Sequence, residues 1–253
     1  MRTLFVGLVA LVMTGILGPL VALARLFRIP QGPQSIYARS VRLWARSVNW
    51  AAGVEVRVHG AERLANTNGL VVVSNHVSWF DIFPLASVVP WCSFIAKSEL
   101  KKIPIFGVGA DAAGIVFLDR DNKKQAFESY KKAATEVQRG RAIVVCPEGT
   151  RGRDYHLRPF KKGPFVLAIA AQSPIIPTIV YGAREVMPKG SFRIRPGTID
   201  LHFLEPVPTA GYDYDHRAEL MAIVWGRMAD AMHSLYGVGT AEHPIAAEGA
   251  RAE

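Results

Sequence analysis

The sequence predicts an α/β domain built on a mostly parallel sheet flanked by helices, preceded by an amino-terminal pair of membrane-seated helices. After Gly53, apolar runs of strand length alternate with amphipathic segments of helical length, as in a parallel sheet with covering helices. Before Gly53, an uncharged stretch of bilayer-crossing length predicts the membrane-seated part. We therefore expect anchoring helices at 1–52, an α/β domain at 53–237, and a disordered tail at 238–253, which lacks apolar periodicity.

The first anchoring segment is residues 3–24, which carry no charged side chain and are long enough to cross a bilayer core of ~30 Å. Gly15, Gly18 and Pro19 interrupt the run and permit a kink or a re-entrant hairpin. A cleaved signal peptide fits less well, because the run is long and Arg25 follows it directly. Since arginines gather after the run, we expect the domain on the cytoplasmic face of the cell inner membrane.

The second anchoring segment is residues 34–52, where apolar and aromatic residues alternate with Arg39, Arg42 and Arg46 at helical spacing. A basic helix with aromatic side chains suits the membrane interface. The alternative is an ordinary amphipathic helix on a soluble core. The neighbouring anchor favours the membrane interpretation.

The elements of the domain follow in order. Residues 54–60 alternate polar and apolar side chains and predict a half-exposed strand, whereas 69–75 form a continuous apolar run that predicts a strand covered on both faces. Further strands are expected at 91–97, 114–120, 142–149, 174–182, 191–197 and 198–207. Helices are expected at 78–89, 123–140, 163–173 and 216–237.

Composition limits the classes of partner. Half of the residues are hydrophobic and only 20% are charged, which predicts contact with lipid or an unusually large core. The net charge of +9 favours anionic partners such as lipid headgroups or phosphorylated substrates, and no nucleic-acid-binding motif is present. Cys92 and Cys146 lie in apolar surroundings and are expected to be buried reduced thiols. The seven histidines show no ligand-pair spacing, so no metal site is expected.

His76 follows the valine run of the buried strand, and Asp81 comes five residues later. On one helix these residues would lie ~140° apart and could not meet. If His76 lies in the turn and Asp81 in the first helical turn, the carboxylate can hold one ring nitrogen while the other accepts a proton from a hydroxyl. Such a pair lacks its own nucleophile, which the substrate would then supply. The alternative is that Ser78 caps the helix and Asp81 favours its dipole.

Two other strand ends carry charged side chains in tight turns: Asp119 and Arg120 after one strand, and the segment 148–151 after another. Because ligands gather at the carboxyl ends of parallel strands, all three turns are expected around one crevice. Gly149 permits a tight turn with exposed amides, and Arg151 can bind a phosphate through two hydrogen bonds. Taken singly, each turn is better explained by a structural salt bridge, but the coincidence of three such turns is harder to explain in that way.

In this order the turns resemble motifs of the lysophosphatidic acid and glycerol-phosphate acyltransferases, over about residues 70–180. The segments are NHVSWFD, GIVFLDR, CPEGTR and IIPTIV, with the similar IAKSELKKIPIFG between the first two. Two positions depart from the pattern: Cys146 replaces an aromatic residue, and Pro164 stands where a small residue is usual. The resemblance implies His76 as general base and Asp81 as its orienting partner. It also implies that the phosphorylated acceptor is bound by Lys97, Arg120, Glu148, Gly149, Thr150 and Arg151.

The resemblance further implies transfer of a fatty acyl group from acyl-CoA or acyl-carrier protein to the free hydroxyl of lysophosphatidic acid, giving phosphatidic acid in phospholipid biosynthesis. No cofactor beyond this thioester co-substrate, and no metal, is implied. Glycerol 3-phosphate or another lysolipid is the alternative acceptor. A membrane-bound hydrolase is disfavoured because no G-x-S-x-G sequence occurs. A non-catalytic membrane-binding protein would explain the charge but not the three reactive turns.

Overall fold

The computed structural model describes residues 1–65, 69–119 and 123–239, and within them one mixed sheet has the strand order β1-β7-β6-β2-β5-β3-β4. All neighbouring strands are parallel except β6 and β7. The expected α/β fold with a mostly parallel sheet is therefore confirmed. The strands are β1 (Val54–His59), β2 (Leu70–Ser74), β3 (Cys92–Lys97), β4 (Val116–Leu118), β5 (Ala142–Val145), β6 (Ile175–Tyr181) and β7 (Gly197–Phe203).

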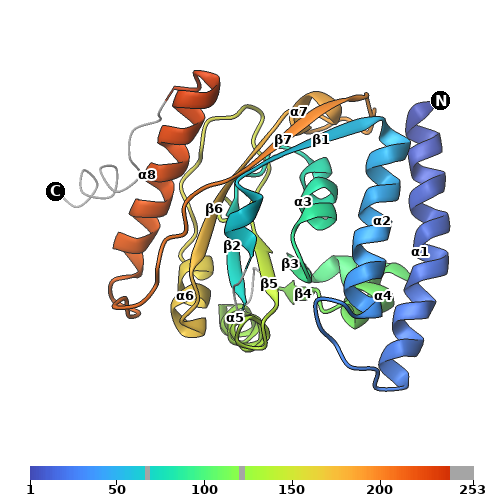
Figure 1. The fold of residues 1–253 in the computed structure, drawn as a ribbon, viewed down its shortest axis with the longest axis horizontal. Helices are drawn as coiled ribbons and strands as arrows, with labels where there is room; N and C mark the ends of the chain where they lie inside the picture. The colour runs from blue at the N-terminus through green and yellow to red at the C-terminus, as the bar shows by residue number, and fades with distance from the viewer. Residues whose placement is uncertain (66–68, 120–122, 240–253) are drawn as a thin grey trace.

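Helices cover both faces of the sheet (Figure 1). α5, α6 and α8 lie on one side, and α3, α2 and α1 lie on the other. The helices are α1 (Arg2–Leu26), α2 (Ile36–Ala52), α3 (Ile82–Val88), α4 (Phe106–Ala112), α5 (Lys123–Gln138), α6 (Gly163–Ala171), α7 (Ala183–Val186) and α8 (Arg217–Tyr236). Three short 3₁₀ turns are η1 (Ala61–Leu64), η2 (Trp79–Asp81) and η3 (Ser98–Lys102).

The centre of the sheet is fully enclosed. Every residue of β2 and β5 is buried, as expected of strands with helices on both faces. β1 alternates at the edge of the sheet, with exposed Glu55 and Arg57 on one face. Because β2 and β5 are parallel, their carboxyl ends lie at the same edge of the sheet.

α1 is one continuous helix in spite of Pro19, so the re-entrant hairpin is not formed. Gly109 of α4 lets the two helices approach closely at Gly18, since a Cβ on Gly109 would lie 3.0 Å from the Gly18 Cα. α1 is long and apolar enough to cross a membrane, and it lies at the outer side of the molecule beside α2 (Figure 1). Its outward face exposes large apolar side chains: Leu4, Phe5, Leu8, Leu11, Val12, Ile16, Leu20, Leu23 and Leu26.

One expected strand is absent from the structure. The strand expected at 191–197 is wrong, because β7 begins only at Gly197, level with the first residue of β1. Before that point no described strand pairs with the chain, and the Ile194 amide donates to the Thr3 hydroxyl at 3.0 Å. Helix α4 was not expected from the sequence. The expected tail lies outside the described residues from position 240 onward.

Candidate active site

The polar turns after β2 and β5 meet at one edge of the sheet. The His76 carbonyl accepts a hydrogen bond from the Gly152 amide at 2.6 Å, and its amide donates to Glu148 Oε1 at 2.9 Å. Both polar groups of the His76 backbone are thus held by the turn that follows β5. Segments 72 residues apart in the chain form one site, as the strand topology predicts.

His76 and Asp81 are hydrogen-bonded, with 2.7 Å between His76 Nδ1 and Asp81 Oδ2. The same carboxylate oxygen accepts from the amides of Val77, at 2.9 Å, and Ser78, at 3.0 Å. Asp81 is 1% exposed, whereas the His76 ring is 20% exposed. The acid is therefore immobile, and the ring it orients is open to a ligand.

Asp81 takes part in the helix cap and also contacts the His76 ring, so the two interpretations of this residue are compatible. The Ser78 side chain caps η2 by accepting from the Phe80 amide at 2.9 Å, and Asp81 completes a capping box with the Ser78 amide. The cap places Asp81 one turn after His76, where it reaches the ring. The local signal for a helix start thus also builds the imidazole–carboxylate pair.

Asn75 has a role that sequence reasoning missed. Its side chain donates to the Val180 carbonyl at 3.0 Å and accepts from the Val180 amide at 2.7 Å. The last paired residues of β2 and β6 are Ser74 and Thr178, so the side chain continues the pairing beyond the backbone ladder. This holds the turn that carries His76 against β6. A buried asparagine directly after an apolar strand is the signal that could have indicated it.

Glu148 is buried, and burial raises its pKa to about 7 from an ordinary value of 4.5. The nearby Asp81 carboxylate raises it further, whereas hydrogen bonds from the His76 and Arg158 amides, together with the Arg158 charge, oppose the shift. Glu148 therefore changes protonation near neutral pH while it holds the backbone of His76.

We expect Glu148→Gln to change the pH dependence of stability. The folded pKa lies above the unfolded value, so the wild-type folded state retains a proton that the unfolded state releases between pH 4.5 and about 7. Wild-type stability should fall relative to the Gln variant by about 3 kcal/mol across that window and then level off. Urea unfolding of both proteins in detergent at several pH values measures this difference. A difference that stays flat from pH 4.5 to 7 would contradict the assignment.

Arg151 lies at the same edge, on the turn after β5. Its guanidinium stacks over the half-exposed Trp79 ring at 5.1 Å, and it has no carboxylate partner among the described side chains. Its carbonyl accepts from Arg158 at 2.9 Å and from Lys189 at 2.7 Å, which fixes the backbone. A cation held over an aromatic face beside His76 is suited to bind an anionic group.

The other expected binding residues lie as follows. Gly149 adopts a left-handed conformation with φ 73°, and Thr150 next to it is exposed. Lys97 ends β3 at this edge; its exposed ammonium group lies 3.7 Å from Glu99. Arg120 lies outside the described residues.

Cys92 and Cys146 form no disulfide with each other. Cys92 is buried, and burial raises the pKa of its thiol to about 12. Cys146, just before the turn of the site, is only partly buried, so the expectation of a buried thiol holds for Cys92 alone.

The chain is similar to known proteins in sequence and in structure. A family model described as "Acyltransferase" matches residues 55–181, about half of the chain. The 1-acyl-sn-glycerol-3-phosphate acyltransferase alpha of Homo sapiens is 34% identical over 177 residues, covering 69% of this chain and 62% of that protein. The 1-acyl-sn-glycerol-3-phosphate acyltransferase of Limnanthes douglasii is 33% identical over 170 residues, covering 66% and 60%. The chain thus spans about three fifths of the length of these curated relatives.

A solved structure is similar over nearly the whole chain. It is the crystal structure of the 1-acyl-sn-glycerophosphate (LPA) acyltransferase, PlsC, from Thermotoga maritima, with a TM-score of 0.78 and 26% identity. The match covers 95% of this chain and 97% of that chain, so it includes α1 and α2 as well as the sheet. The family model matches about half of the chain and includes β2 and β5, whose turns form the site around His76. The chain therefore belongs to the acyltransferase family.

Proposed function

We propose that this chain transfers a fatty acyl group from an acyl thioester to the free hydroxyl of lysophosphatidic acid, giving phosphatidic acid for phospholipid biosynthesis. The observation that carries the proposal is the His76–Asp81 pair: it supplies a base, and among the described residues no hydroxyl or thiol is hydrogen-bonded to the His76 ring. The nearby Ser74 and Ser78 hydroxyls donate instead to the carbonyls of Asn75 and Met187. The names of the similar proteins supply the acceptor, 1-acyl-glycerol 3-phosphate.

The mechanism follows from the ring geometry. With Nδ1 held by Asp81, His76 Nε2 is available to take the proton of the acceptor hydroxyl. The hydroxyl oxygen attacks the thioester carbonyl, a new ester bond forms, and the carbon–sulfur bond breaks. The thiol leaves with a proton returned from the imidazolium that Asp81 stabilises. No cofactor other than the thioester co-substrate takes part in these steps.

Arg151 is proposed to bind the acceptor phosphate, with Lys97, Arg120, Gly149 and Thr150 as further contacts. Arg151→Ala should raise the Michaelis constant for lysophosphatidic acid about tenfold or more with a smaller effect on kcat, because a lost charged hydrogen bond costs ~1.5–3 kcal/mol. Steady-state kinetics with varied acceptor measures this. Arg153→Ala, which removes an exposed arginine two residues away, is the matched control. Equal Michaelis constants for the two variants would argue against phosphate binding at Arg151.

The acceptor and donor classes can be tested together. Purified protein in detergent is given lysophosphatidic acid, glycerol 3-phosphate or a neutral lysolipid, each with acyl-CoA and with acyl-carrier protein. We expect lysophosphatidic acid to be the preferred acceptor with at least one of the two donors. If glycerol 3-phosphate is preferred, the alternative acceptor is the correct one. If the neutral lysolipid is preferred, the enzyme does not recognise the acceptor by a phosphate group. The charge of +9 suits either anionic donor.

We further propose that α1 and α2 seat the chain in the cell inner membrane, with the α/β domain on the cytoplasmic face. The exposed apolar face of α1 supports the seating, because a face of this size is costly in water. α2 adds exposed Trp50 and Arg46, a combination typical of the lipid interface. The arginines that follow α1 support the cytoplasmic orientation.

A further inference from the structure

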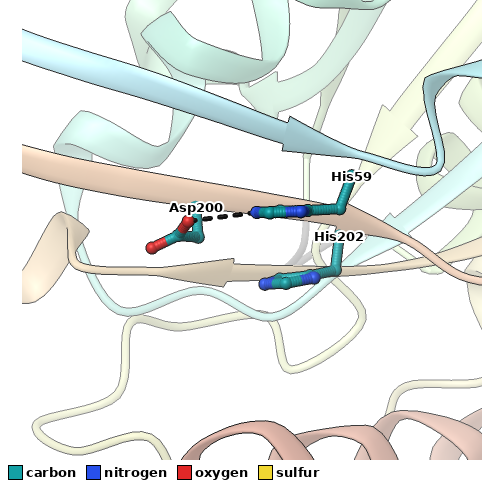
Figure 2. Close-up of side chains that lie close together, drawn as sticks. All are labelled: His59, Asp200 and His202. Carbon is teal, nitrogen blue, oxygen red and sulfur yellow. Dashed lines mark hydrogen bonds and ion pairs between the residues drawn. The ribbon is translucent and has the colours of Figure 1, made fainter.

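A second cluster of ionisable side chains lies on the sheet apart from His76. His59 ends the edge strand β1, and Asp200 and His202 lie on the neighbouring β7. His59 and His202 are partners in the parallel register, so their side chains share a face of the sheet. Figure 2 shows the two imidazole rings extending side by side, with the Asp200 carboxylate at the edge of the His59 ring. In the strand order β6 and β7 separate β1 from β2, which leads to His76.

From this geometry we infer a binding site for one divalent transition-metal ion, of the zinc type, formed by His59, Asp200 and His202. One nitrogen from each ring and one carboxylate oxygen all lie within 4.8 Å of one another. Two imidazoles and a carboxylate form a ligand set that suits zinc and its neighbours, whereas magnesium and calcium prefer oxygen ligands alone.

The atoms need only a small adjustment to bind an ion. Metal–ligand bonds of ~2.0–2.2 Å in a tetrahedron separate the ligand atoms by about 3.4 Å. His59 Nε2 and Asp200 Oδ1 are already 3.2 Å apart. The rings of His59 and His202 are stacked at 4.2 Å with planes 7° apart, so a tilt of one ring would bring its nitrogen into place. The His59 side chain is half exposed, which leaves its ring free to tilt and places the fourth ligand position toward solvent.

His202 is held in place by a supporting contact, as metal-binding histidines usually are. Its Nε2 lies 2.6 Å from the Tyr236 hydroxyl at the end of α8. The Tyr236 ring in turn stacks on Tyr181 at 3.6 Å, which fixes the hydroxyl. A bound ion would therefore connect the edge strand β1 to β7 and, through His202, to α8. Binding should stabilise this edge of the domain.

The competing explanation is a stacked histidine pair with one hydrogen bond and no ion. Tag-free, metal-stripped protein in detergent is titrated with Zn²⁺ alone by calorimetry, and with Co²⁺ by visible absorption. We expect one ion to bind per chain in a saturable manner. The absorption bands of bound Co²⁺ should have the intensity typical of four-coordinate Co²⁺, and Zn²⁺ should raise the Tm of the protein. His59→Ala should lower the affinity at least tenfold and abolish the rise in Tm. Asp200→Asn should lower the affinity while keeping the shape of the side chain.

Two histidine variants outside the cluster serve as controls. His216→Ala removes an exposed histidine paired with Asp213 at 2.7 Å, and His76→Ala removes the active-site pair. Both should bind Zn²⁺ like the wild type. The inference is overturned if wild type and His59→Ala bind equally, or if His76→Ala abolishes binding, because the ion would then lie at the active site. His59 is exposed, so its variant should fold, and circular dichroism checks this.

Discussion

Replacing His76 with alanine should lower the rate of acyl transfer about 10²–10⁴-fold, the usual contribution of a positioned general base. The substitution removes the ring that Asp81 orients at 2.7 Å. It leaves the backbone contacts of residue 76 with Glu148 and Gly152, since both involve the main chain. The variant should therefore remain folded and membrane-bound. The measurement is kcat/KM with lysophosphatidic acid, beside circular dichroism and vesicle binding.

Asp81→Asn tests the orienting partner separately. Its oxygen can still accept from the Val77 and Ser78 amides, so the turn should keep its shape. The same oxygen can also accept from His76 Nδ1, but the neutral amide cannot stabilise the imidazolium that forms when Nε2 takes a proton. Activity should fall by orders of magnitude while the fold is kept. Near-normal activity of His76→Ala would show that another group is the base.

Placing three aspartates on the outward face of α1 should abolish binding to lipid vesicles. Leu8, Val12 and Ile16 are spaced by four residues and are all exposed, so they lie along one side of the helix. Each apolar side chain contributes ~1.5–3 kcal/mol when buried, so the triple variant should lose ~5–9 kcal/mol of membrane binding, more than a 10³-fold change in partitioning. Vesicle flotation measures the bound fraction.

A matched variant controls for charge. Phe192, Tyr214 and Leu235 are also large, apolar and exposed, and changing all three to aspartate alters the net charge by the same amount. This control should float with vesicles like the wild type. If both triple variants float equally, α1 is not the membrane-binding element. If both fail to float, charge and not the apolar face governs binding.

Much of the fold could be predicted because its signals are local. The valine run of β2 is buried on all sides, and the turn after it contains the predicted His76–Asp81 pair. The distance from His76 to Asp81 required a turn between them, and the cap at Ser78 supplies it. Periodicity and capping depend on neighbouring residues, so one sequence is enough to detect them.

Contacts between distant segments could not be predicted in this way. Arg141 is fully buried, and no expectation from the sequence concerned it. Its guanidinium donates to Glu136 and to the Ala113 carbonyl, and it stacks on Trp91 at 4.9 Å. These partners come from separate segments, and no local pattern indicates that they meet. The wrong prediction of a strand at 191–197 has the same cause. A strand needs a partner strand, and the sequence of this segment does not show whether a partner lies beside it.

The residues of the site were predicted from the sequence, but not all of their contacts. The resemblance implies that Glu148 contacts the acceptor, and the structure adds that its carboxylate accepts from the His76 amide. His59 and His202 are 143 residues apart and become neighbours only through the pairing of β1 with β7. Linear spacing of histidines therefore gave no sign of the cluster of His59, Asp200 and His202. The order of β1 and β7 in the sheet was the missing information.

The central claim is that the lipid supplies the nucleophile, and thiol release measured with and without acceptor tests it most directly. Purified protein is mixed with an acyl thioester, and free thiol, phosphatidic acid and free fatty acid are followed together. We predict thiol release only when lysophosphatidic acid is present, with one phosphatidic acid formed for each thiol. A burst of thiol equal to the enzyme concentration without acceptor would reveal an acyl-enzyme, and steady release of fatty acid would reveal a hydrolase. Either result would contradict the mechanism proposed for His76 and Asp81.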